Sequence, residues 1–250
     1  MISNKMQDQL NQRSAIRECY GLATKLAEKV GRENVYDFTL GNPNVPAPAS
    51  VNESIKKIVD TTDSVQLHGY MLNAGFPDVR ETVADSINRR FGTNFNGSNI
   101  VMTVGAAGGM NVMFKVLLNP GDEVITFSPF FSEYRNYVTN YDGVLVEVLS
   151  DPKTFMPDVE ALRAAINEKT KLVTIQRSKG YATRPSFSVA QIGEVIAFCK
   201  QCKPDVICMV DNCYGEFTEL REPSDVGADM IVGSLIKNPG GGLAPTGGYV

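Results

Sequence analysis

Hydrophobic positions alternate between two periods along most of the chain. Short apolar runs, typical of buried strands, are separated by segments with an apolar residue every three or four positions, which is typical of amphipathic helices. The short runs predict strands at 99–104, 123–127, 144–149, 172–176, 206–211 and 230–234. The longer segments predict helices at 108–118, 133–140, 158–168 and 189–202. This alternation favours a three-layer α/β fold, with a mostly parallel sheet and helices on both faces.

A different pattern covers the first 48 residues. Helical spacing continues from residue 3 to residue 30 and ends at Gly31, which predicts an amphipathic helical arm. Residues 35–40 alternate as in a strand. The segment 41–48 contains three prolines, and their missing N–H groups exclude a continued strand. We therefore expect an N-terminal helical arm and an ordered loop over residues 1–48.

Two helices are expected to open a larger domain over residues 49–250. The residues from Ser50 to Glu53 have the order of a capping box, which predicts a helix through about residue 59. Pro77 fits the first turn of a second helix over 78–91.

Composition excludes several classes of protein. Of the 250 residues, 43% are hydrophobic and 21% are charged, which is ordinary for a globular chain. The net charge of −4 offers no basic field for a phosphate backbone, so we expect no nucleic-acid partner. The first residues are too polar for a signal sequence, and no segment reaches the ~18 apolar residues of a membrane span. We expect a cytoplasmic protein that does not bind a membrane.

The histidine and the cysteines of the sequence predict neither a metal site nor a catalytic triad. His68 is the single histidine, so multi-histidine metal sites are excluded, and no Gly-x-Ser-x-Gly elbow accompanies it. Cys199 and Cys202, followed by Cys208 and Cys213, have a spacing that also fits zinc. However, Cys208 lies inside an apolar strand, where cysteine behaves as a small hydrophobic residue. We expect reduced structural thiols and no metal site.

In open parallel sheets, ligands bind beyond the carboxyl ends of the strands. After the strand that ends at residue 104, the small residues 105–109 lead into a helix whose N-terminus would favour an anion such as phosphate, although a plain tight turn also explains them. After the strand that ends at residue 127, Pro129 presents Phe130 or Phe131, either of which could stack on a flat ligand or pack in the core.

Two further strand ends carry charged residues. Asp211 ends a strand as a carboxylate, which either caps the next helix or pairs with a protonated ring nitrogen. Lys237 follows the strand 230–234 and precedes a glycine-rich stretch. Its side chain is either exposed to water or desolvated. Desolvation lowers the pKa of a lysine, and Schiff-base chemistry requires such an amine. A phosphate cradle, a stacking ring, a carboxylate and an amine together describe a site for pyridoxal 5'-phosphate.

The sequence resembles the fold type I pyridoxal-phosphate-dependent enzymes in two unequal pieces. Residues 1–175 resemble the class I/II aminotransferases of the aspartate type. The runs that carry this likeness are 37–48, 68–75, 103–109 and 119–124. Residues 176–250 resemble the aluminium-resistance family, which is related to methionine γ-lyase. The runs that carry that likeness are 176–185, 210–216 and 233–242. The two likenesses therefore predict a chimeric chain, with a splice near Ile175.

The resemblance implies a role for the residues around the cofactor. Lys237 would form the Schiff base and move the proton at the substrate Cα. Asp211 would pair with the pyridine nitrogen, and Tyr214 would bind the phenolic oxygen. The implied phosphate ligands are Gly105, Ala106, Ala107 and Ser234.

The resemblance also implies residues at the edges of the site. Phe131 would stack on the cofactor ring. Tyr70 would reach the phosphate of a neighbouring subunit, which implies a homodimer. Gly41, in the loop that aminotransferases fold over the substrate, would approach the substrate carboxylate.

Some features depart from the aminotransferase pattern. The Gly-x-Arg-x-Gly motif after the lysine is missing, so the phosphate would be held more loosely or by Arg177. The C-terminal small domain, which carries the arginine for the substrate carboxylate, has no counterpart in the sequence. These features leave three functions open: an aminotransferase acting on an amino acid with a 2-oxo acid acceptor, a carbon–sulfur lyase, or a truncated or engineered module that binds the cofactor without turnover.

Overall fold

The computed structural model describes residues 2–10, 15–39, 46–180, 182–238 and 247–250. The chain divides into two compact units, residues 1–44 and 45–250, each of which is described by itself. The expected boundary at residue 48 stays a prediction.

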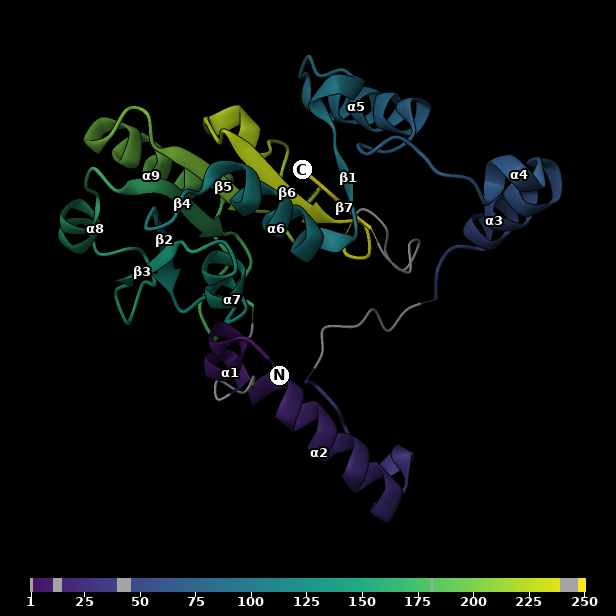
Figure 1. Ribbon diagram of the computed structural model, residues 1–250, viewed down its shortest axis with the longest axis horizontal. Coiled ribbons are helices and arrows are strands. Elements are labelled where there is room, and N and C mark those ends of the chain that lie inside the picture. The colour runs from purple at the N-terminus through teal and green to yellow at the C-terminus, as the bar shows by residue number, and fades with distance from the viewer. Residues whose placement is uncertain (1, 11–14, 40–45, 181, 239–246) are drawn as a thin grey trace. The chain divides into compact units, whose positions relative to one another are not determined.

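A seven-stranded sheet with the order β1-β7-β6-β5-β4-β2-β3 organises the larger unit (Figure 1). The strands are β1 Met102–Thr103, β2 Glu123–Ser128, β3 Val144–Leu149, β4 Thr170–Gln176, β5 Ile207–Asp211, β6 Met230–Ser234 and β7 Gly248–Tyr249. The strands from β2 to β6 run parallel, whereas β7 lies antiparallel between β6 and β1. Five of the predicted strands are confirmed within two residues at each end, and the mostly parallel sheet is confirmed.

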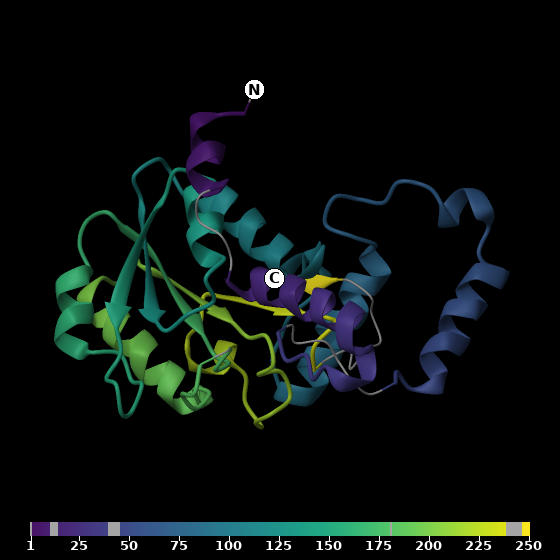
Figure 2. The same cartoon turned by 90° about the horizontal axis from the view of Figure 1, so that it is seen from below.

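Two helix layers cover the sheet because successive side chains of a buried strand point to opposite faces. On one face, Ile125, Val173 and Val210 contact side chains of α8 (Val159–Ala165) and α9 (Val189–Cys202). On the other face, Val124 and Leu172 belong to a second cluster with residues of α6 (Gly105–Leu117) and α7 (Tyr134–Thr139). Figure 2 shows the teal α6 and α7 on one side of the strands and the green α8 and α9 on the other. The three-layer prediction is therefore confirmed.

Local sequence signals explain where α9 begins. The side chain of Ser188 accepts a hydrogen bond from the backbone N–H of Gln191 at 3.2 Å. The Gln191 side chain in turn accepts one from the N–H of Ser188 at 2.9 Å. This capping box satisfies two donors that the first turn of a helix leaves unpaired. Five side chains of α9 are almost fully buried, namely Val189, Ile192, Val195, Ile196 and Cys199, and the last four belong to the core cluster on this face of the sheet.

Shorter elements and the remaining helices complete the chain. The helices are α1 Asn4–Leu10, α2 Ala15–Val30, α3 Ala49–Thr61, α4 Ser64–Leu67 and α5 Pro77–Phe91, with 3-10 turns η1 Arg32–Asn34, η2 Gly97–Asn99 and η3 Pro223–Val226. Within the predicted helix over 3–30, the described residues form α1 and α2, and residues 11–14 lie outside the described ranges. No helix in the described ranges is both long enough and apolar enough to cross a membrane.

Two strand predictions are wrong. Residues 35–39 form no strand: Tyr36 and Phe38 are 83% and 87% exposed, and the Asp37 carboxylate accepts hydrogen bonds from the N–H and hydroxyl of Thr39. The described residues of this N-terminal unit contain no strand with which the alternating segment could pair. The predicted strand 99–104 shrinks to the two residues of β1, because its partner β7 is itself only two residues long. Nothing in the sequence pattern marks so short a strand as β7.

Candidate active site

The carboxyl group of Asp211 lies at the carboxyl end of β5 and is 8% exposed. Its neighbours across the sheet are Gln176 on β4 and Val232 on β6. One carboxylate oxygen accepts the Tyr134 hydroxyl, and the other accepts the N–H of Cys213 at 3.1 Å. Burial raises the pKa of Asp211, while these hydrogen bonds and the charge of Lys237 act in the opposite direction. A cationic partner at this carboxylate would favour its ionised form.

Lys237 approaches the same strand ends from the turn after β6. Its ammonium nitrogen lies 4.6 Å from the centre of the Tyr214 ring. The backbone of Tyr214 has φ of 67°, an uncommon conformation for a residue with a side chain. The neighbouring Asn238 amide donates to the carbonyls of Tyr214 and Glu216, both at 2.9 Å, and so ties the lysine turn to the loop after β5. Three of the predicted residues, Lys237, Tyr214 and Asp211, therefore converge.

The predicted phosphate ligands also come together. Gly105 begins α6 with φ of 71°, and no side chain caps the helix N-terminus, so its first N–H groups point toward an anion position. Gly248 pairs with Ser234, and a Cβ added to Gly248 would lie 2.3 Å from the backbone carbon of Gly105. Ser234 itself is 3% exposed. Ala106 and Ala107 follow in the first turn of α6, and β7 lies between the start of that helix and Ser234. Phosphate binding by these four residues stays a prediction.

The aromatic side of the site contains Phe131 and Tyr134. Phe131 is half-buried, and its ring meets the edge of the Tyr134 ring with 5.9 Å between centroids. The N–H of Phe131 donates to the side-chain oxygen of Gln176 at 2.8 Å. Because Tyr134 also donates to Asp211, the chain of contacts runs from Phe131 to the carboxylate. Stacking of Phe131 on a cofactor ring stays a prediction.

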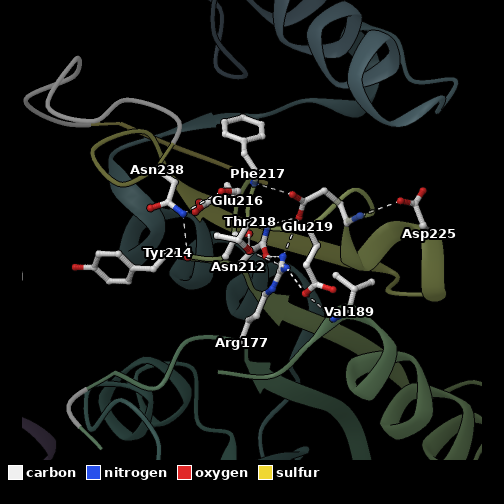
Figure 3. Close-up of polar contacts among 12 residues, drawn as sticks. Arg177, Val189, Asn212, Tyr214, Glu216, Phe217, Thr218, Glu219, Asp225 and Asn238 are labelled. Carbon is white, nitrogen blue, oxygen red and sulfur yellow. Dashed lines mark hydrogen bonds and ion pairs between the residues drawn. The ribbon is translucent and has the colours of Figure 1, made fainter. Parts of the chain in front are cut away.

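Arg177 is committed elsewhere, so the alternative of Arg177 as a phosphate ligand finds no support in its contacts. Its side chain is 2% exposed, and one guanidinium nitrogen donates to Asn212 at 2.8 Å and to Glu222 at 3.1 Å. The other nitrogen donates to Thr218 at 3.2 Å and to Glu219 at 2.9 Å. Figure 3 shows Arg177 reaching toward this acidic loop while the Tyr214 ring points away from it. Arg177 therefore braces the loop that carries Tyr214.

Two predicted residues stand apart from these contacts. The Tyr70 side chain is fully exposed in the single chain, so its predicted reach into a neighbouring subunit is not tested. Gly41 lies outside the described residues, and its role at the substrate carboxylate stays a prediction.

Sequence reasoning missed three residues of the site. Tyr134, Glu216 and Asn238 contact the predicted residues directly. Asn238 adjoins Lys237, and Glu216 ends the run 210–216, so position in the sequence could have drawn attention to both. Tyr134 carries no such signal, because the pairing of its hydroxyl with Asp211 joins residues 77 positions apart.

Among the described residues, no cluster of three His, Cys, Asp or Glu side chains could hold a metal ion. Cys199 and Cys208 are fully buried in the core beneath α9. The described residues fit pyridoxal phosphate: small residues at a helix N-terminus, a buried carboxylate that forms no ion pair with an arginine in the described part of the chain, and an amine within its electrostatic reach. This fold and site define the large domain of a fold type I pyridoxal-phosphate enzyme.

Comparison with known proteins identifies the family. A sequence model described as methionine gamma-lyase matches residues 111–250, which is more than half of the chain. The chain belongs to the methionine gamma-lyase family. The match runs through residue 175, and β4 pairs with β2 on one side and β5 on the other, so the segments around that residue share one sheet. A splice there stays a prediction.

Individual relatives connect the chain to aminotransferases as well. The uncharacterized protein YnbB of Bacillus subtilis is 47% identical over 150 residues, which are 54% of this chain and 34% of YnbB. The putative aminotransferase YugH of the same organism is 30% identical over 218 residues, 86% of this chain and 53% of YugH. An aminotransferase structure from Eubacterium rectale superposes on all of this chain with a TM-score of 0.85 and 33% identity, and 65% of that chain is covered. This chain therefore spans about a third to two thirds of the length of these relatives.

The Arg177 network predicts a structural effect of substitution. Arg177→Met leaves the nearly buried carboxylate of Glu222 without a cation and should lower the free energy of unfolding by about 3–5 kcal/mol. Arg135→Met removes an ion pair with Glu147 that is half exposed and should cost less than about 1 kcal/mol. Urea unfolding of both variants measures the difference. An Arg177→Met protein of unchanged stability but weaker phosphate binding would contradict the structural role.

Proposed function

We propose that this protein is a pyridoxal-phosphate-dependent aminotransferase, acting on an amino acid with a 2-oxo acid acceptor. The convergence of Lys237, Asp211 and Tyr214 at neighbouring strand ends is the observation that carries the cofactor assignment. When bound, the cofactor supplies an aldehyde that condenses with amines and a ring that accepts electrons. The structural likeness to aminotransferases over the whole chain supports amino transfer as the reaction.

Different residues of the chain would bind the different parts of the cofactor. Lys237 would bind the aldehyde carbon and carry a proton to and from the substrate Cα. Asp211 would keep a proton on the pyridine nitrogen, and Tyr134 and the Cys213 N–H hold its carboxylate in place for that task. Gly105, Ala106, Ala107 and Ser234 would bind the phosphate, largely through backbone N–H groups and the helix N-terminus. Tyr214 would bind the phenolic oxygen beside the lysine.

The cofactor assignment predicts one attachment point. Protein incubated with pyridoxal phosphate should absorb near the band of a protein-bound Schiff base, and borohydride reduction followed by peptide mapping should locate the label on Lys237. Lys237→Ala should abolish the label and lower turnover at least about a hundredfold. An absorption band that survives in Lys237→Ala would contradict the assignment. The exposed Lys153 provides a control, and Lys153→Ala should keep both label and turnover.

A carbon–sulfur lyase is the second candidate, because the family match favours it. Methionine can serve as a common test substrate. An aminotransferase converts it to its 2-oxo acid only when a 2-oxo acid acceptor is present and aminated in return. A lyase releases a thiol and ammonia without an acceptor. We expect acceptor-dependent amino transfer, and thiol release without an acceptor would favour the lyase. If label forms on Lys237 but neither reaction occurs with a panel of amino acids, the protein is a binding module without turnover.

A homodimer belongs to the same proposal. The fully exposed Tyr70 is the residue expected to cross to the neighbouring subunit. Light scattering of the chain with bound cofactor should give twice the mass of 27.2 kDa, and a monomer would contradict it. A cytoplasmic location is likewise proposed, and cell fractionation would test it.

A further inference from the structure

Glu216 is a buried acid beside the site to which none of the proposed steps gives a role. Its side chain is 3% exposed. One carboxyl oxygen, Oε1, accepts the N–H of Ser234 at 3.4 Å and the hydroxyl of Tyr249 at 3.3 Å. The other oxygen, Oε2, is buried and has no hydrogen-bond partner among the described residues. A buried oxygen without a partner is costly, and the cost is far larger for a carboxylate than for a neutral acid.

In the part of the chain that the structure describes, Glu216 forms no ion pair, and several of the groups that act on it are acids. Facing it are Asp211 at the end of β5, Cys213 in the following loop, and Tyr249 on β7. Arg177, which follows β4 and reaches the loop after β5, forms ion pairs with Glu219 and Glu222. Lys237, in the turn after β6, acts on Asp211 and Cys213. Burial, with a smaller contribution from Asp211, raises the pKa of Glu216 to about 7.

Glu216 is connected to the phosphate cradle through Ser234. The backbone N–H of Ser234 is fixed by Oε1, and its hydroxyl accepts the N–H of Ile236 at 3.3 Å. Tyr249, the second donor to Oε1, follows Gly248, whose backbone lies against Gly105. The carboxyl group therefore joins the two strands, β6 and β7, that form one wall of the cradle. An anion held there would lie close to the same carboxyl group.

We propose that Glu216 is a positioning residue of the phosphate site that works as a neutral carboxylic acid, so that a phosphate dianion binds beside Ser234 only while Glu216 carries a proton. The inference rests on the proposed cofactor site. Two like charges in a poorly solvated cleft repel each other strongly, and a proton on one of them removes the repulsion. Binding of the phosphate and protonation of Glu216 are then linked.

The linkage fixes the direction of the pH effect. The apparent dissociation constant equals the intrinsic one divided by the fraction of competent, protonated protein. With a pKa of about 7, raising the pH from about 7 to about 8.5 should weaken the affinity for pyridoxal phosphate by about fifteenfold. The ligand's own phosphate group is already mostly dianionic in this range, since the second pKa of a phosphate monoester is about 6.

The test compares the wild-type chain with Glu216→Gln, whose amide resembles the neutral acid and does not titrate. Affinity for pyridoxal phosphate is measured at about pH 7 and about pH 8.5, with pyridoxal, which lacks the phosphate, as the control ligand. We expect the phosphate-specific loss of affinity in the wild-type protein and in the control Glu194→Gln, an exposed position on α9. Glu216→Gln should bind equally well at both pH values.

Two further measurements exclude a merely structural effect. Tyr249→Phe removes a hydrogen bond that lowers the pKa of Glu216, so the loss of affinity should move to higher pH. In the folded chain Glu216 keeps its proton to about pH 7, against a usual pKa of 4.5, so the folded state holds more protons than the unfolded state between these values. Stability therefore falls as pH rises through this window, and Glu216→Gln should unfold at higher urea than the wild-type protein at about pH 8.5.

The outcomes separate this inference from the proposed function. An equal loss of affinity in the wild-type protein and Glu216→Gln, with label still on Lys237, would overturn the role of Glu216 and leave the cofactor assignment intact. Absence of any label on Lys237 in the wild-type protein would overturn the cofactor assignment, and the inference with it.

Discussion

The carboxyl group of Asp211 lies out of water at the end of a central strand, and the free energy of keeping a charge there organises the residues around it. Two donors, the Tyr134 hydroxyl and the Cys213 N–H, occupy its oxygens. The charge of Lys237 acts on it and favours its ionised form. A carboxylate held in this way is suited to a protonated ring nitrogen, because such a partner offsets the cost of burial that the chain itself offsets incompletely.

Positive charge is distributed unevenly around the strand ends. The buried Arg177 forms ion pairs with Glu219 and Glu222 in the loop after β5. Its positive charge is therefore neutralised there and is not directed at the proposed phosphate site. The cradle instead offers backbone N–H groups, a helix N-terminus and the Ser234 hydroxyl. Such a site binds through fixed dipoles, and a nearby acid such as Glu216 therefore matters more than it would beside an arginine. Arg177 thus braces the loop, and the proposed phosphate ligands are other residues.

The sequence predicts the sheet and the strand-end residues well because both follow from local rules. Apolar runs of five to seven residues mark β2 to β6, and the carboxyl ends of parallel strands must share an edge. These rules predict that Asp211 and Lys237 lie at the same edge of the sheet. They fail for β7, which has two residues and exists only because β1 and β6 flank it. They also fail for Tyr134 and for the role of Arg177, because long-range contacts decide which polar side chain meets which.

The position of β7 also bears on the order in which the fold is assembled. Chains fold as they are made, starting from the N-terminus. The four parallel strands from β2 to β5 can pair while later residues are still being added, whereas β1 gains its place in the sheet only when Gly248 and Tyr249 insert beside β6. The same insertion brings Gly248 against Gly105 and the Tyr249 hydroxyl to Glu216. During synthesis, the core can therefore form first, and the contacts around the proposed anion site can be completed only after residue 249 has left the ribosome.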